Sequence, residues 1–227
     1  MKKISIKGPI VQSNSQRIYD WLGMEAASPK SVNSALEEAH GEPVDVEINS
    51  GGGEIMAASE IYTALRNYSG GVRIHIVGLA ASAASVIAMA GRSDMTPTGM
   101  MMIHNVQTSA SGDYREMEHN AEVLRRANQT IASAYRDKTG KSEEDILRMM
   151  DAETWVTAEQ AVALGLVDCV MELPRGAPTV TADFSSGMLD EETMQRIRAL
   201  IDSKPGALAI ERAQAKFEFL TLKGVKK

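Results

Sequence analysis

The sequence predicts an α/β fold in which crossover helices connect the strands of a parallel sheet. Short runs in which apolar and polar residues alternate, as in strands, are followed repeatedly by segments with apolar residues at helical spacing. Glycines stand at many of the junctions and mark where one element ends. With 227 residues, 44% of them hydrophobic, the chain is long enough for one sizeable domain with a buried core.

The first half of the chain supplies the alternation of strands and helices in order. The expected elements are a strand over 2–10, helices over 15–27 and 28–42, a strand over 43–50, a helix after the glycine run 51–53 and a strand over 72–78. Gly78 is then expected to open another helix that runs to about residue 91. This order of elements favours a parallel sheet.

The second half begins with two short strands and is dominated by a long polar helix that ends at Gly140. Ser142, followed three residues later by Asp145, resembles a capping box at the start of the next helix. The expected elements are strands over 93–99 and 100–106, helices over 112–140, 142–153 and 157–165, and a strand over 166–172. We expect a domain over 1–173, a linker over 174–188 and a charged helical appendage over 189–227.

Composition and charge exclude several classes of function. The net charge is −6 and the only basic cluster is terminal, which argues against nucleic acid as the main partner. The first residues lack the apolar core of a signal peptide, and no apolar run reaches the roughly 20 residues that a membrane span requires. Cys169 is the single cysteine, so neither an internal disulfide nor a cysteine metal site is expected. We therefore expect a cytoplasmic protein that uses no metal and no cofactor.

The segment "GLAASAASVIAMAG", residues 78–91, carries two hydroxyls among small apolar residues. A catalytic serine needs a turn with small neighbours, where its hydroxyl is exposed and the next backbone N–H can stabilise an oxyanion. Ser82 fits this description, although it lacks the G-x-S-x-G pattern. Taken alone, Ser82 and Ser85 are better explained as small residues that pack within a helix.

Histidines, glycines and acids supply the remaining candidates. His104 ends an apolar strand, where it could be a general base or a hydrogen-bonded core residue. His75, flanked by isoleucines, is interpreted as structural, and His40 and His119 as solvated. The N–H groups of Gly52 and Gly53 could form an oxyanion hole or merely a tight turn. The acids of "MMDAETW" could orient a histidine or cap a helix.

Four segments of the sequence, taken in their order along the chain, indicate a function more specifically than any one of them alone. "INSGGGEIMAASEIYTAL", "GLAASAA", "MIHN" and "ETWVTAEQAVALGLVD" together resemble the proteolytic subunit of the Clp protease, the ClpP family. The resemblance covers residues 3–172. It implies a ClpP/crotonase-like fold of repeated ββα units, with residues 112–140 as a protruding handle helix.

Carried over to this sequence, the resemblance makes Ser82 the nucleophile and His104 the general base. Gly53 and Ala83 would supply the N–H groups of the oxyanion hole, and Ser85 would be a packing residue. The family's aspartate falls on Glu153, with Asp151 as the alternative acid. The sequence also departs from the family pattern, because Gly51 stands where proline is usual.

The resemblance implies a serine endopeptidase whose active sites face a chamber formed by heptameric rings, stacked in pairs as a tetradecamer. The chain starts almost at its first strand and continues beyond residue 174, a layout similar to phage or prophage proteins that process capsid or scaffold proteins. For such a protein we expect polypeptide substrates and no need for a Clp ATPase. The alternatives are an ATPase-dependent Clp proteolytic subunit, a crotonase-like acyl-CoA enzyme and a non-catalytic ring or scaffold subunit.

Overall fold

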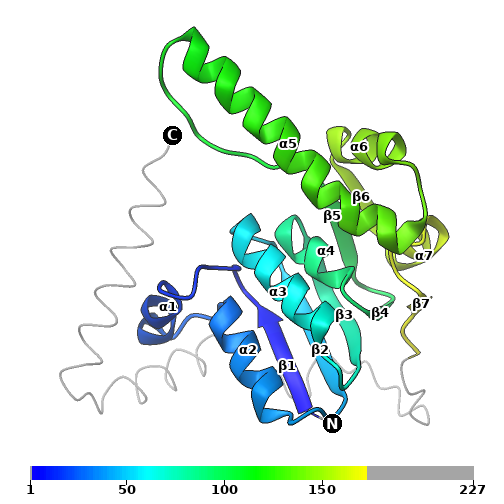
Figure 1. Ribbon diagram of the computed structural model, residues 1–227. Helices are drawn as coiled ribbons and strands as arrows, with labels where there is room; N and C mark the ends of the chain where they lie inside the picture. Colours follow the sequence, from blue (N-terminus) through cyan, green and yellow to red (C-terminus); the bar gives the residue numbers. More distant parts are fainter. Residues whose placement is uncertain (1, 173–227) are drawn as a thin grey trace, which may run out of the picture. The chain divides into compact units, whose positions relative to one another are not determined.

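The computed structural model describes residues 2–172, and apart from Trp21–Gly23 these residues form one compact unit (Figure 1). The linker expected over 174–188 and the appendage expected over 189–227 lie outside the described residues. Within residues 2–172, no helix combines the length and the apolar character that crossing a membrane requires.

In the described part of the chain, the sheet contains seven strands and is parallel except at one edge. Its main path runs β1-β2-β3-β4-β7, while β5 pairs with β3 and β6 pairs with β5 in the antiparallel sense. The strands are β1 (Lys2–Lys7), β2 (Val44–Ser50), β3 (Val72–Ala81), β4 (Arg92–Met95), β5 (Met100–Ile103), β6 (Thr154–Thr157) and β7 (Cys169–Val170). The predicted α/β class and parallel sheet are therefore confirmed.

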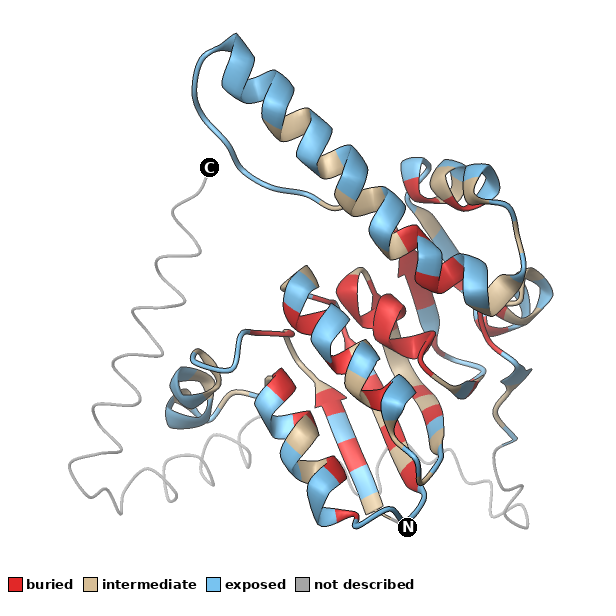
Figure 2. Cartoon of the chain, viewed as in Figure 1, coloured by how far each residue is buried: buried red, intermediate tan, exposed pale blue. Residues whose placement is uncertain are grey.

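Within residues 2–172, seven helices accompany these strands. They are α1 (Gln16–Leu22), α2 (Pro29–Glu38), α3 (Ile55–Asn67), α4 (Ala83–Ala88), α5 (Tyr114–Thr139), α6 (Glu143–Asp151) and α7 (Ala158–Leu164). In Figure 1, α2, α3 and α4 lie side by side over one face of the sheet. Alternate strand residues such as Ile6, Ile48 and Ile76 are buried on the core face, as the period of two requires. Figure 2 shows this burial as red bands along the strands and on the inner sides of the helices.

Two elements near the centre of the sheet differ from the sequence-based expectation. The strand expected to stop at Gly78 continues to Ala81, because its last residues pair with β5 after its first residues have paired with β4. Residues 78–81 are therefore strand, and the expected helix begins only at Ala83. The strand β6 was not predicted at all, because four residues between two helices carry little periodicity.

The long helix α5 has the predicted extent and ends at Gly140, which adopts the left-handed conformation. Its buried residues are confined to the C-terminal third, at Ala132, Ala134 and Tyr135. The rest of the helix has no buried residue, and its residues are exposed or half-buried (Figure 2).

The capping interaction predicted for α6 is only half formed. The Ser142 hydroxyl accepts from the backbone N–H of Asp145, but the Asp145 carboxylate bonds that hydroxyl and does not reach back to the backbone of the cap residue. Its side chain is shorter than the Glu or Gln of a full capping box.

Candidate active site

A pocket of about 530 Å³ lies where three neighbouring parallel strands end. The glycine run follows β2, Ser82 follows β3 and His104 follows β5. The carboxyl ends of parallel strands lie at one edge of a sheet, so the topology brings these three segments together. The pocket is lined by Gly53, Glu54, Ile55, Ser82, Ala83, His104, Asn105, Val106, Gln107, Ile131 and Tyr135.

Ser82 lies at the turn from β3 to α4 in an unusual backbone conformation, with φ 55° and ψ −127°. Its N–H donates to the Met102 carbonyl of β5 at 2.9 Å. A non-glycine residue with such dihedrals costs about 1–3 kcal/mol and persists only where its surroundings hold it. The Ser82 side chain makes no capping bond to α4, so its hydroxyl remains available to the pocket.

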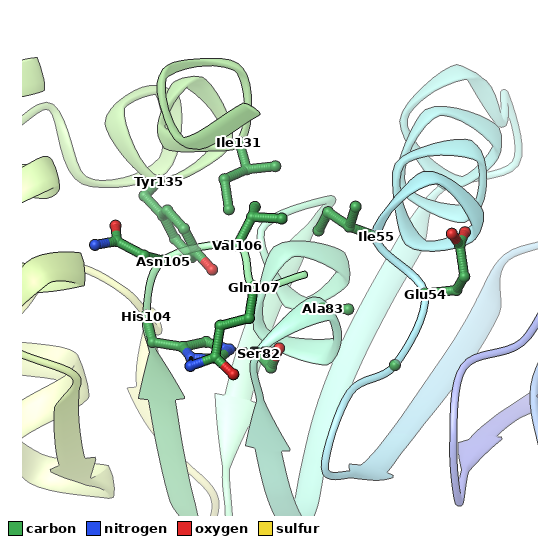
Figure 3. Close-up of a pocket in the computed structure, with 11 residues that line it drawn as sticks. Glu54, Ile55, Ser82, Ala83, His104, Asn105, Val106, Gln107, Ile131 and Tyr135 are labelled. Carbon is green, nitrogen blue, oxygen red and sulfur yellow. Dashed lines mark hydrogen bonds between the residues drawn. The ribbon is translucent and has the colours of Figure 1, made fainter. Parts of the chain in front are cut away.

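The Nε2 atom of His104 lies 2.7 Å from the Oγ atom of Ser82. Figure 3 shows the two side chains turned toward each other, with Tyr135 and Ile131 reaching the pocket from α5. The chain after His104 is held by α5, because the Val106 N–H donates to Asn128 Oδ1 at 2.8 Å. A hydroxyl and an imidazole at this distance can exchange a proton directly.

The glycine turn packs directly against the turn that carries Ser82. A Cβ atom on Gly52 would lie only 2.7 Å from the Ser82 Cβ and 2.9 Å from the Ala83 nitrogen. Gly52 itself is anchored, because its N–H donates to the Ser50 hydroxyl, which in turn donates to the Gly8 carbonyl. Only a residue without a side chain fits at this point.

Gly53 forms a one-residue parallel bridge with Ile10. The Ile10 N–H donates to the Gly52 carbonyl, and the Glu54 N–H donates to the Ile10 carbonyl, both at 2.9 Å. Backbone groups of successive residues in an extended segment point to opposite sides, so the N–H of Gly53 points away from Ile10. Gly53 lines the pocket, and a Cβ atom there would collide with the Ile10 carbonyl at 2.2 Å.

Comparison with known proteins agrees with this geometry. The profile of the Clp protease family matches residues 30–174, well over half of the chain. The chain belongs to the Clp protease family. Membership of the Clp protease family supports a serine-type endopeptidase rather than an acyl-CoA enzyme.

Individual relatives show the same similarity over most of their length. The ATP-dependent Clp protease proteolytic subunit 1 of Chlamydia muridarum is 29% identical over 170 residues, covering 70% of this chain and 87% of the relative. The subunit of the same name from Chlamydia abortus is 30% identical over 136 residues, covering 58% and 71%. That of Streptomyces avermitilis is 33% identical over 132 residues, covering 57% and 61%.

The two acids considered for the Clp protease site lie at the same edge of the sheet, but neither carboxylate bonds His104. Because β6 runs antiparallel to β5 with Thr154 opposite Ile103, Glu153 comes next to His104 in register. The Glu153 carboxylate accepts from the Trp155 indole at 3.2 Å, and Asp151 accepts from the Asn105 amide at 2.7 Å.

The Nδ1 atom of His104 lies 3.5 Å from the Gln107 amide nitrogen, at the limit of a hydrogen bond. Gln107 comes from the segment between β5 and α5, and it also lines the pocket. Among the residues described, Nδ1 therefore has only this weak partner, and the ring is fixed mainly through Nε2.

The other histidines lie away from the pocket. The ring of His75 is held by two carboxylates, with Nδ1 2.8 Å from Asp94 and Nε2 3.3 Å from Asp45. Burial alone would lower the pKa of His75, but the hydrogen bonds to the two carboxylates outweigh it and raise that pKa above its usual value. His40 and His119 are exposed, as their polar surroundings predicted.

Several residues of the pocket were not found from the sequence. Ile131 and Tyr135 come from the C-terminal part of α5, where they belong to an apolar stripe that gives no sign of facing a pocket. The interpretation of Ser85 as packing alone is incomplete, because its buried hydroxyl bonds both the Ser82 carbonyl and the Tyr135 hydroxyl. The signal that could have found it was a polar residue in an otherwise apolar six-residue helix.

Proposed function

We propose that the protein hydrolyses peptide bonds through an acyl-enzyme formed on Ser82. His104 Nε2 takes the hydroxyl proton as Ser82 Oγ attacks the peptide carbonyl, and it then protonates the leaving amine as the C–N bond breaks. Water attacks the resulting ester with His104 again as the base, which releases the acid and restores the serine. The observation that carries this proposal is the 2.7 Å separation of the two reacting atoms.

The N–H groups of Gly53 and Ala83 are proposed to bind the oxyanion of the tetrahedral intermediate. Support comes from the direction of the Gly53 N–H, away from Ile10, and from the contact of the glycine turn with the Ser82–Ala83 peptide. Removing one such donor costs roughly 100-fold or more in turnover, so the geometry of the turn is part of the catalyst.

For the third member of the triad we propose Glu153, with Asp151 as the alternative. The register of β5 and β6 favours Glu153, which adjoins His104 across the strand pair. A rotation of its exposed side chain away from Trp155 would be needed to reach Nδ1. A carboxylate at Nδ1 holds the ring in the tautomer that leaves Nε2 free to accept a proton.

We further propose that the protein is a cytoplasmic homo-oligomer of heptameric rings, possibly paired into a tetradecamer. The exposed apolar side chains of Tyr114, Met117 and Val123 on α5 support an interface between copies, because such a helix gains little stability from its own propensity. The proposed substrates are polypeptides, in particular capsid or scaffold proteins of a phage, cut without a Clp ATPase.

The test compares the wild-type protein with Ser82→Ala, using the exposed Ser133→Ala on α5 as the matched control. We expect a fluorophosphonate probe to label the wild type and the control but not Ser82→Ala, and unstructured peptides to be cut without ATP. Sedimentation of the same samples at micromolar concentration should show an oligomer.

Labelling or peptide cleavage that survives in Ser82→Ala would remove the nucleophile assignment. Cleavage that appears only with a Clp ATPase and ATP would leave the peptidase but end the ATPase-independent role. A monomer in sedimentation would contradict the rings.

A further inference from the structure

A chain of hydrogen bonds between buried groups lies behind the turn that carries Ser82. The Ser85 hydroxyl donates to the Ser82 carbonyl at 2.6 Å and lies 2.7 Å from the Tyr135 hydroxyl. Ser85 is 0% exposed and Tyr135 is 1% exposed. Residues from α4 and α5, fifty positions apart in sequence, therefore meet at the backbone of the residue that faces His104.

The direction of each bond follows from the groups involved. The Ser82 carbonyl can only accept, so the single hydrogen of the Ser85 hydroxyl points to it. The Tyr135 hydroxyl must then donate to Ser85 Oγ. Burial raises the pKa of Tyr135 well above its ordinary value, more than the bond to Ser85 lowers it, so the phenol keeps its proton at neutral pH.

The Ser82 carbonyl belongs to the same planar peptide as the Ala83 N–H. In a trans peptide these two groups point in opposite directions, so a bond that fixes the carbonyl also fixes the N–H. The carbonyl accepts from the Ser85 N–H at 3.0 Å as well as from its hydroxyl. With the bond from the Ser85 N–H alone, the Ser82–Ala83 peptide could still rotate about that one hydrogen bond. The second bond, from the Ser85 hydroxyl, restricts this rotation.

Packing does not account for the hydroxyl of Ser85. All six residues of α4 are buried, and the other five are apolar. Alanine at this position would fill almost the same space, while a hydroxyl without a partner would cost free energy in such surroundings. The benefit of the hydroxyl must therefore come from its two hydrogen bonds.

We propose that Ser85 and Tyr135 are positioning residues that orient the Ser82–Ala83 peptide, and with it the Ala83 N–H, toward the oxyanion. The proposal rests on the peptidase mechanism above and adds two residues to it. Neither side chain touches the substrate carbonyl or takes a proton. Both act through the backbone of the nucleophile turn, so their removal should slow the chemical steps more than it weakens substrate binding.

The test measures kcat, KM and Tm for Ser85→Ala, Tyr135→Phe and the double variant on a short fluorogenic peptide. Loss of one buried hydrogen bond at the turn should lower kcat by about three- to tenfold in each variant, with KM within about twofold of wild type. The matched control is Ser28→Ala, since Ser28 is an equally buried serine that caps α2 away from the pocket. It should lower Tm without changing kcat.

The double variant separates positioning from stability. Ser85→Ala leaves the buried Tyr135 hydroxyl without a partner and should lower Tm, whereas adding Tyr135→Phe removes that hydroxyl and should restore part of the Tm. The kcat should remain at the reduced level, because both substitutions break the same link. A kcat that recovers together with Tm, or single variants with wild-type kcat, would overturn the proposal.

Failure of the proposed peptidase function can be told apart from failure of the positioning role. If the wild type is not labelled by a fluorophosphonate and cuts no peptide, the proposed function fails, and crystal structures of the wild type and Ser85→Ala then decide on the positioning role. The proposal requires the Ser82–Ala83 peptide to rotate in the variant. An unchanged peptide orientation would overturn it independently of any activity.

Discussion

His75 lies on β3 and His104 directly follows β5 of the same sheet, and the two histidines differ in what their ring nitrogens contact. His75 has a carboxylate at each nitrogen, from Asp94 and Asp45, on the strands either side of β3. His104 has the Ser82 hydroxyl at Nε2 and only a weak contact with Gln107 at Nδ1. His104 also lines the pocket, whereas His75 does not.

The difference separates a structural imidazole from one that can take part in a reaction. Two carboxylates favour the protonated ring of His75, so it tends to keep its proton and join three strands. The His104 ring faces the Ser82 hydroxyl, so it can accept the hydroxyl proton and return it. His104 can therefore take the proton of Ser82 during a reaction. The two carboxylates beside His75 instead favour a ring that keeps its own proton.

The same substitution at the two histidines should have very different effects on activity. His104→Gln should lower kcat/KM for peptide hydrolysis by roughly 10³-fold or more, because the base that activates Ser82 is lost. His75→Gln should leave kcat/KM within about twofold of wild type, because His75 contacts no group of the pocket. Steady-state assays on one fluorogenic peptide, with circular dichroism to establish folding, measure both.

A His104→Gln protein that keeps its activity would show that the 2.7 Å contact with Ser82 is not used in the reaction. A folded His75→Gln protein that loses activity as severely would remove the distinction between the two rings.

The Nδ1 atom of His104 has only a weak contact with Gln107. Substitution of Glu153 and of Asp151 should show which of the two is the third member of the triad. Glu153→Gln should lower kcat by roughly 10²- to 10⁴-fold with little change in KM, because an amide cannot stabilise the imidazolium. Asp151→Asn keeps the size of its side chain and should change kcat by less than about threefold. The two variants have matched chemistry, and both positions are exposed, so differences in folding should be small.

If Asp151→Asn is the variant that loses activity, the triad uses the alternative acid. Wild-type activity in both would assign the orientation of the ring to Gln107, the remaining group near Nδ1.

The sequence predicted those parts of the molecule whose signal is local. Periodicity and capping residues account for the α/β class and for the extent of α5, which ends at Gly140. They also account for the cap of α7 at Thr157. The family resemblance indicated Ser82 and His104, and in the structure these two side chains lie within hydrogen-bonding distance.

The parts that the sequence did not predict depend on contacts between distant segments. The strand β6 exists because it pairs with β5, and that pairing brings Glu153 next to His104. The continuation of β3 past Gly78 depends on a change of neighbouring strand. The Ser85–Tyr135 bond joins residues whose local patterns both indicate ordinary packing. No window of a single strand or helix contains such information.

His75 should also make a small contribution to stability that depends on pH. The pKa of His75 is raised in the folded protein, so the stability it contributes is present below the unfolded pKa of about 6.5 and is lost as pH rises through the folded pKa. Wild type should therefore exceed His75→Gln in Tm by about 1–3 °C near pH 6, and by less near pH 9. The partners that hold the proton are Asp45 and Asp94, and Asp45 also pairs with Arg73. A Tm difference that is constant between these pH values, measured by scanning calorimetry, would mean that His75 is neutral in the folded protein and that the two carboxylates do not retain its proton.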